Sequence, residues 1–308
     1  MRNVFPAVLV FVFANLAFAS DPTALEALKK KATAGDASAQ VQLGSFYDHG
    51  RDVKQSYKEA AKWYGLAAAQ GNALAQNNVG SLYLNGLGVK KDYVKALELF
   101  HKAADQGQPN AQCSLGLMYD NGWGVPANPT EANAWYQKAA DNGDAEAMYN
   151  LGLSHGQGSG MPADPVKAFT YFEKAANCGL ANAQRQVGYC YLNGVGVTKD
   201  PTAAVGWFRK AAKQGDIPSV ANLGIAYRDG LGVDVDFIES FAWLDIARFG
   251  TQLWQDDMKT KWGVRHELDV LKKQMSPAQL KAGEARTKQL YEELRRYQGA
   301  PPVPPATS

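Results

Sequence analysis

Apolar and polar residues recur in the same order along most of the chain. Ala, then Leu or Val, then Tyr stand four residues apart, as at Ala39, Leu43 and Tyr47. Residues four apart share one face of an α-helix, so this pattern predicts a helix that buries that face. A glycine follows the central Leu or Val six times, at Gly44, Gly80, Gly116, Gly152, Gly188 and Gly224. Because glycine inside a helix costs up to about 1 kcal/mol, we expect a second helix to pack closely against it.

A second apolar pattern follows each of these helices after a short link. One link reads Asn85-Gly86-Leu87-Gly88-Val89, and two glycines around an apolar residue favour a turn with positive φ. The second helix then begins at an N-capping residue in every copy. These capping residues are Ser56, Asp92, Asn128, Asp164, Asp200 and Asp236. The predicted buried face of the second helix carries Ala60, Trp63 and Ala67 in the first copy, and the Trp ring would fill the space between repeats.

The two helices together repeat every 36 residues without an insertion. A glycine marks each boundary, at Gly35, Gly71, Gly107, Gly143, Gly179 and Gly215. A polar residue follows each of these glycines except at Leu180, so one helix ends in a left-handed C-cap and the next begins with an N-cap. A fixed period of this length is typical of repeat arrays. We therefore predict six helix-turn-helix repeats over residues 35–250, the sixth closing one residue early at Gly250.

The segments on either side of the repeats complete the predicted domain organisation. Residues 20–34 match only the second half of a repeat and predict an N-terminal capping helix. Between residues 251 and 298 the period is lost, and an amphipathic helix around Leu268 is followed by another that begins at Ser276-Pro277. Two such helices would cover the apolar face of the last repeat as a C-terminal helical cap. Residues 299–308 are rich in proline and predict a disordered tail.

The first nineteen residues have the composition of a secretory signal peptide. Arg2 is followed by an apolar run that ends in Ala17-Phe18-Ala19, which fits cleavage after Ala19. The run is shorter than the roughly 20 apolar residues that an uncleaved membrane anchor needs. We therefore expect a periplasmic or secreted protein with no membrane span after cleavage.

Overall composition is that of an ordinary globular protein, with 46% hydrophobic and 20% charged residues and a net charge of +2. This near-balanced charge gives no support for nucleic-acid binding. The three cysteines, Cys113, Cys178 and Cys190, are an odd number, and we interpret all three as small buried apolar residues.

The repeats resemble the Sel-one-like repeat (SLR) family, a relative of the tetratricopeptide repeat. One copy supplies its pattern through Ala111, Leu115, Gly116, Tyr119, Gly122, Gly124, Val125, Ala132, Trp135, Ala139, Ala140 and Gly143. The resemblance implies an all-α fold, a right-handed superhelical α/α solenoid of six 36-residue repeats with a C-terminal helical cap. It also implies protein binding, often in signalling, envelope regulation or host contact. His155 in place of Tyr and Asp52 in place of Gly depart from the pattern, so we expect those links to differ in shape.

No residue pattern predicts catalysis, a cofactor or a metal. None of the four histidines has a second His or a Cys at a metal-ligand spacing, and no Ser-x-x-Lys sequence occurs. A Gly-x-Ser-x-Gly sequence is present at Gly152–Gly156, but it lies within a predicted first helix and not at the strand-to-helix turn of a nucleophile elbow. The Gly-x-Gly links follow helices and lack a third glycine, unlike dinucleotide-binding loops. We therefore predict a non-enzymatic protein with no catalytic, cofactor-binding or metal residues.

Positions that vary between copies indicate where a partner could bind. If the first helices line the concave face of the solenoid, the varying positions on that face include Asn77, Ser81, Cys113, Leu117, Tyr149, Leu153, Arg185, Tyr189 and Ile225. Cys113, Leu117, Tyr149, Leu153 and Tyr189 would form an apolar, partly exposed band, which suggests a groove for a protein or peptide. In the other interpretation about half of these residues touch only neighbouring helices.

Three functions remain open from sequence. The favoured one is an exported, non-enzymatic adaptor that binds a partner protein or peptide on the concave face. The alternative is an exported cell-wall or β-lactam-directed hydrolase or binding protein. The third is a structural spacer without a partner.

Overall fold

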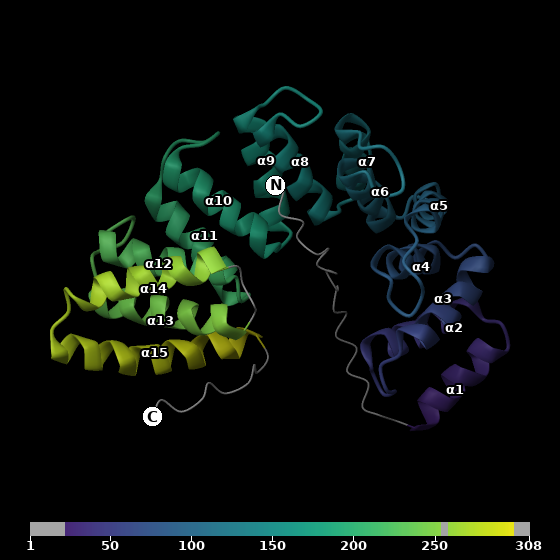
Figure 1. The fold of residues 1–308 in the computed structure, drawn as a ribbon, viewed down its shortest axis with the longest axis horizontal. Helices are drawn as coiled ribbons and strands as arrows, with labels where there is room; N and C mark the ends of the chain where they lie inside the picture. Colours follow the sequence, from purple (N-terminus) through teal and green to yellow (C-terminus); the bar gives the residue numbers. More distant parts are fainter. Residues whose placement is uncertain (1–21, 254–257, 299–308) are drawn as a thin grey trace. The chain divides into compact units, whose positions relative to one another are not determined.

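The computed structural model describes residues 22–253 and 258–298, and this part of the chain contains helices and no strand (Figure 1). The predicted signal peptide and proline-rich tail lie outside these residues. The array begins with α1 (Pro22–Thr33). The first helices of the repeats, called A helices here, are α2 (Ala37–His49), α4 (Ala73–Asn85), α6 (Pro109–Asn121), α8 (Ala145–Gln157), α10 (Ala181–Asn193) and α12 (Ile217–Asp229). The second helices, called B helices, are α3 (Tyr57–Ala69), α5 (Tyr93–Ala104), α7 (Pro129–Asp141), α9 (Pro165–Asn177), α11 (Pro201–Lys213) and α13 (Phe237–Leu253). The predicted all-α helical solenoid is therefore confirmed.

Helix contacts divide the chain into two compact units with the boundary between Gln106 and Gly107. The first unit, called unit 1 here, contains α1 to α5. The second, unit 2, contains α6 to α13 together with α14 (Met258–Lys272) and α15 (Pro277–Gln298). No helix in the described part of the chain is long and apolar enough to cross a membrane.

The links between A and B helices share one conformation. The N–H of each B-helix N-cap donates to the carbonyl of the Tyr position in the preceding A helix, as from Asp200 to Tyr191 at 2.8 Å. The two sequence departures keep this geometry. Asp164 donates to the carbonyl of His155 at 2.8 Å, and Asp52 takes a φ of 56°, the left-handed value of the glycines it replaces. The expectation that these two links differ in shape is therefore wrong.

The glycine inside each of the first five A helices lies against an aromatic ring of the following B helix, and Gly224 of the sixth lies against Leu244, which confirms the predicted close approach. A Cβ atom on Gly44 would lie 2.6 Å from the ring of Tyr64, closer than real Cβ contacts allow. The ring that fills this space is not the predicted Trp. Tyr64 is 1% exposed, whereas Trp63 beside it is only half-buried. The same position holds Phe100, Tyr136, Phe172 and Phe208 in the next four copies.

Trp63, Trp135 and Trp207 lie at the edge of the core, each with a lysine over its ring. Trp135 is 9% exposed and Trp207 is half-buried, and the ammonium groups of Lys138 and Lys210 sit 3.8 and 3.6 Å from their ring centroids. A cation over an aromatic face is attracted by the ring quadrupole. The predicted Trp positions therefore lie at the rim of the core, and the residue that follows each Trp fills its centre.

Buried amides tie the B helices of four repeats to neighbouring A helices. Gln184 of α10 is 6% exposed, donates to the carbonyl of Ala176 in α9 at 3.2 Å, and accepts from Gln214 after α11 at 2.9 Å. We call such a pair an amide clamp. Three further clamps join Gln40 to Gln70, Gln76 to Gln106, and Gln112 to Asn142. Each clamp stabilises its repeat by satisfying polar groups that are shielded from water.

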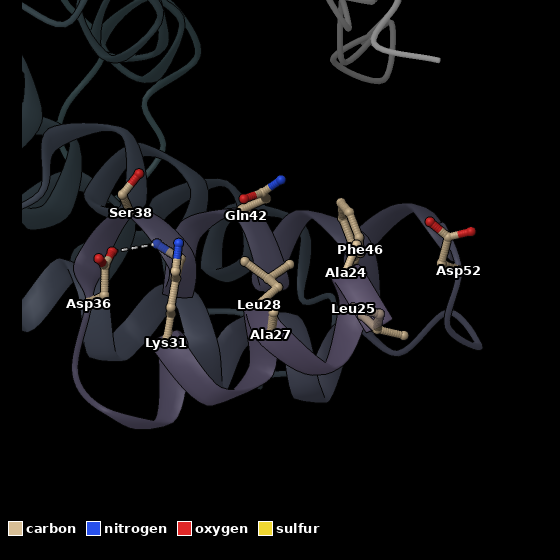
Figure 2. A pocket seen from close by; sticks show the side chains of 11 residues that line it. Ala24, Leu25, Ala27, Leu28, Lys31, Asp36, Ser38, Gln42, Phe46 and Asp52 are labelled. Carbon is tan, nitrogen blue, oxygen red and sulfur yellow. Dashed lines mark hydrogen bonds between the residues drawn. The ribbon is translucent and has the colours of Figure 1, made fainter. Parts of the chain in front are cut away.

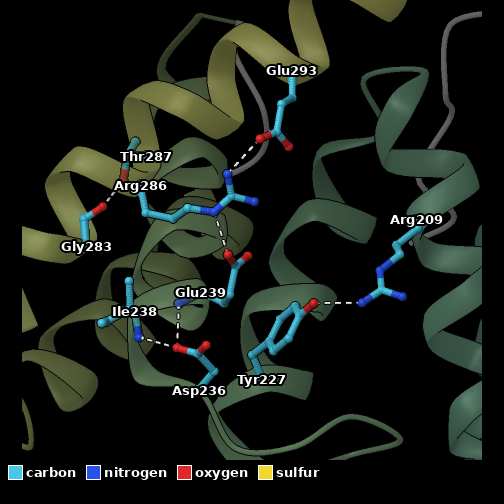
Figure 3. A network of polar contacts seen from close by, with 9 residues as sticks. All are labelled: Arg209, Tyr227, Asp236, Ile238, Glu239, Gly283, Arg286, Thr287 and Glu293. Atoms are coloured by element: carbon cyan, nitrogen blue, oxygen red, sulfur yellow. Dashed lines mark hydrogen bonds and ion pairs between the residues drawn. The ribbon is translucent and has the colours of Figure 1, made fainter.

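The C-terminal helices cover the last repeat. α13 runs through Gly250 to Leu253, so Gly250 does not end the helix as the sequence pattern predicted. Leu268 and Leu271 of α14 are at most 1% exposed and pack with Phe241 and Leu244 of α13. Figure 3 shows Arg286 of α15 between the carboxylates of Glu239 on α13 and Glu293 on α15.

The cysteines differ in burial. Cys113 and Cys190 are buried, but Cys178 is exposed at the C-cap of α9, so its predicted burial is wrong. All three are free thiols in this structure.

Candidate protein-binding face

Five of the predicted binding residues lie half-buried on the A helices of unit 2. We call Leu117, Tyr149, Leu153, Tyr189 and Ile225 the A-helix face. Each packs one side against a buried cluster of the core and leaves the other side accessible to solvent. The expected partly exposed apolar residues are thus present on α6, α8, α10 and α12.

The two tyrosines of this face are fixed from behind. The ring of Tyr149 lies 5.6 Å from the ring of Phe172, and that of Tyr189 lies 5.4 Å from Phe208 in an edge-to-face arrangement. The Tyr189 hydroxyl accepts a hydrogen bond from the side-chain amide of Asn222 at 2.9 Å. The rings are therefore held in place before any partner arrives.

Two predicted binding residues are too buried to offer a surface. Cys113 and Asn77 are each 6% exposed, so the expected partial exposure of Cys113 is wrong. Cys113 packs with Tyr136 and Leu151, and burial raises the pKa of its thiol well above the usual value, helped by the nearby Asp144 carboxylate. In unit 1, Ser81 donates to the carbonyl of Asn77 at 3.1 Å.

Arg185 is held by the fold. Its guanidinium pairs with the carboxylate of Asp216, which is the N-cap of α12 and accepts from the N–H of Ser219 at 2.9 Å. Side-chain exposures of 20% and 10% show that this ion pair is largely shielded. Arg185 therefore connects α10 to the start of α12.

A carboxylate that the sequence pattern did not indicate lies beside the A-helix face. Glu146 is in the first turn of α8, one turn before Tyr149 and Asn150. Burial, followed by the charge of Asp144, raises the pKa of Glu146 to about 7. Burial also raises the pKa of Asp144, the N-cap of α8, although the N–H of Ala147 and the thiol of Cys113 partly offset it. Only the capping role of Asp144 was readable from sequence, because the burial of Glu146 depends on packing.

The histidine that replaces Tyr has a packing role. His155 stacks on Tyr171 with ring centroids 5.5 Å apart, and burial followed by the charge of Lys167 lowers its pKa. Among residues 22–253 and 258–298, no three His, Cys, Asp or Glu side chains are grouped so that they could hold a metal ion.

Comparison with known proteins identifies the repeat. A model described as Sel1 repeat matches six consecutive segments, residues 37–72, 73–108, 109–144, 145–180, 181–216 and 217–247. These segments make up more than half of the chain. It belongs to the Sel1 repeat family. Sel1-repeat proteins generally mediate protein–protein interactions and are typically non-enzymatic. A search of curated proteins found no match.

Two solved structures of Sel1-repeat proteins are similar over most of the chain. One is a protective antigen present in uropathogenic Escherichia coli strains and displaying an SLR fold, with 32% identity, a TM-score of 0.78, and coverage of 94% of this chain and 62% of the other. The other is a Sel1 repeat protein from Oxalobacter formigenes, with 36% identity, a TM-score of 0.69, and coverage of 73% and 93%. The chain thus spans less than two thirds of the length of the Escherichia coli protein.

Proposed function

We propose that this protein is an exported, non-enzymatic scaffold that binds a partner protein or peptide on the A-helix face of unit 2. The observation that carries the proposal is the pair of half-exposed rings of Tyr149 and Tyr189, each supported by a buried Phe. Rigid aromatic side chains lose little conformational entropy on binding and are common anchors of protein interfaces. The general role of Sel1-repeat proteins in protein–protein interaction supports the same conclusion.

The partner segment should combine apolar side chains with a cation. Leu117, Leu153 and the two rings offer apolar contacts, and Glu146 makes no ion pair with the residues that the structure describes. A Lys, Arg or amino terminus placed beside Glu146 would supply the missing positive charge and favour the ionised carboxylate.

The signal-peptide composition of residues 1–19 supports export, and we propose that the scaffold acts in the periplasm or outside the cell. The similarity to a protective antigen of uropathogenic Escherichia coli supports a role in the envelope or in host contact. Amino-terminal sequencing of the protein from its host tests this step, and Ser20 is the expected first residue.

A photo-crosslinking amino acid at position 153 tests the binding face. In living cells, we expect it to capture a defined partner, whereas the same group at Val166, which is 62% exposed on α9, should not. Equal capture from both positions, or none from position 153, contradicts the proposed face. Hydrolysis of a chromogenic β-lactam by the purified protein would contradict the non-enzymatic role.

A further inference from the structure

A groove runs along the N-terminal end of unit 1, between α1 and α2 (Figure 2). It encloses a volume of about 390 Å³. Its apolar lining includes Leu25 and Leu28 of α1 and Phe46 of α2, with Lys31 and Asp36 toward one end. None of these residues belongs to the A-helix face.

Comparison of α1 with the later B helices indicates that the groove has the place of an A helix that is missing from the described residues. Counting back by one repeat of 36 residues from α3, Ala24 and Leu28 of α1 stand where α3 has Ala60 and Tyr64. Those two residues of α3 are at most 1% exposed, because α2 covers them. On α1 no A helix precedes them in the described residues, so Ala24 is exposed and Leu28 is only half-buried.

The sixth repeat gives the closest internal model, since it also has Leu at this position. Leu244 is 0% exposed, and a Cβ atom on Gly224 of α12 would lie 2.6 Å from its Cγ. A helix that seats on Leu28 in the same way must therefore present Gly, or another very small residue, at the point of contact.

Phe46 supports the same interpretation from the other wall of the groove. It is half-buried, although its counterparts one, two, four and five repeats later are at most 7% exposed. Those counterparts are Leu82, Met118, Cys190 and Ala226. An incoming helix would give Phe46 the burial that these four later positions have.

We propose that this groove binds an amphipathic helix of a partner protein, in the place where an A helix packs in every repeat. Asp36 at the same end of the groove caps α2 by accepting from the N–H of Ala39, so the charge of Lys31 defines the partner further. Lys31 occupies the repeat position that Ala247 holds in the sixth repeat, where the side chain is fully buried. The first turn of an incoming helix would lie near this position. The positive end of a helix dipole is unfavourable beside an ammonium group, so the partner helix carries a carboxylate in its first turn. This binding mode is helix-in-groove recognition, with a small residue and an acidic residue as its two markers.

The probe is a helix-stabilised, fluorescent peptide with the sequence of Asp216–Asp229 and the change Val220→Glu. Fluorescence anisotropy measures its affinity for the chain that begins at Ser20. We expect saturable binding that weakens about tenfold or more for protein with Leu28→Glu, and likewise for peptide with Gly224→Leu. The matched control is Val94→Glu, at an exposed position of α5, and it should leave the affinity unchanged. Lys31→Glu should weaken binding of this peptide and restore binding of a peptide with Val220→Lys.

Other occupants give different results, and each overturns the proposal. If a second copy fills the groove, sedimentation shows a dimer that Leu28→Glu abolishes and that the peptide does not displace. If the chain's own residues 1–19 are the natural occupant, the uncleaved chain fails to bind the peptide and is more stable than the chain from Ser20. No saturable binding, or equal binding to the Leu28→Glu variant, overturns it directly. Crosslinking from position 153 is independent of Leu28, so failure here leaves the A-helix face untouched.

Discussion

Single glycines set how closely the helices of each repeat pack. In α10, a Cβ atom on Gly188 would lie 2.5 Å from the ring of Phe208, whereas one on Gly206 of α11 would meet no atom within 4 Å. Both glycines are inside helices, so their intrinsic helix propensities are equal. Their environments alone decide the effect of adding a methyl group.

We therefore expect opposite effects from the same change at these two positions. Gly188→Ala should lower the free energy of unfolding by about 1–3 kcal/mol, because the Phe208 ring has to move within a packed core. Gly206→Ala should raise it by about 0.5–1 kcal/mol by removing freedom from the unfolded chain. Urea denaturation of both variants measures the difference, and equal shifts would show that the ring is free to move.

The charge of Glu146 should make the stability of unit 2 depend on pH. Its pKa is raised from 4.5 to about 7, chiefly by burial, so the folded state holds this proton to higher pH than the unfolded state does. The resulting stabilisation is present below about pH 4.5 and is lost as the pH rises through 7. In the variant Glu146→Gln, the free energy of unfolding should fall less between about pH 5 and 8, by on the order of 1–3 kcal/mol. If thermal unfolding shows the same pH slope in the variant, another group is responsible.

Residue-scale prediction from sequence was limited by the geometry of the helix itself. Trp63 and Tyr64 stand three and four residues after Ala60, and both spacings lie on the same face. Only the position of Gly44 across the interface selects Tyr64 for the core. The exposure of Cys113 had the same difficulty, because neighbouring helices and not its own helix determine its burial.

At the scale of the helices, the amide clamps explain a variation among the repeats. Gln40, Gln76, Gln112 and Gln184 each pair with a Gln or Asn at the end of the following B helix. The fourth repeat has Met148 and Cys178 at these two positions, and the sixth has Val220 and Gly250. Both partners are replaced together, since a buried amide without its partner costs about 1–3 kcal/mol. This accounts for an exposed cysteine at position 178.

A double-mutant cycle in the fifth repeat tests this coupling. Gln184→Met alone should cost about 1–3 kcal/mol, because the carbonyl of Ala176 and the amide of Gln214 lose a partner. The change Gln214→Cys should lower the free energy of unfolding less in the Gln184→Met variant than in the wild type. The difference between these two losses is the coupling energy, which we expect to be about 0.5–1.5 kcal/mol. The matched control is Gln186→Met on the same helix, where no clamp is broken. Strict additivity would mean that the paired replacement is coincidental.

The helix boundaries were the best-predicted feature, because their signals are local. The side chain of Asp36 accepts from the N–H of Ala39 at 2.8 Å, and Leu180 is the one A-helix N-cap without such a bond, as the sequence indicated. A capping side chain acts within four residues of its own position, so no tertiary information is needed. The continuation of α13 past Gly250 escaped prediction because Gly250 lies against Ile217 of α12, a tertiary contact that the local sequence does not show.

At the scale of the whole chain, α14 and α15 end the array within unit 2. Arg286 connects α15 to α13 through Glu239, whose side chain is 20% exposed. We expect Arg286→Met to destabilise this contact by about 1–3 kcal/mol and to increase hydrogen exchange in α15, because Glu239 would lose its counter-ion. Arg295→Met removes only a surface pair at 3.7 Å and should change exchange little. Equal exchange in both variants would show that apolar packing alone holds α15.

The second glycine of each link has a consequence for how such chains change in length. Gly88, Gly160, Gly196 and Gly232 each lie against the backbone at the start of the preceding B helix, so the same joint connects one repeat to the next within each unit. A genetic crossover between two copies within one unit would remove or duplicate whole repeats and form the same joint again. Because the joint is the same at each of these positions, the number of repeats within a unit can change by recombination while the helix pair of every remaining repeat keeps its packing.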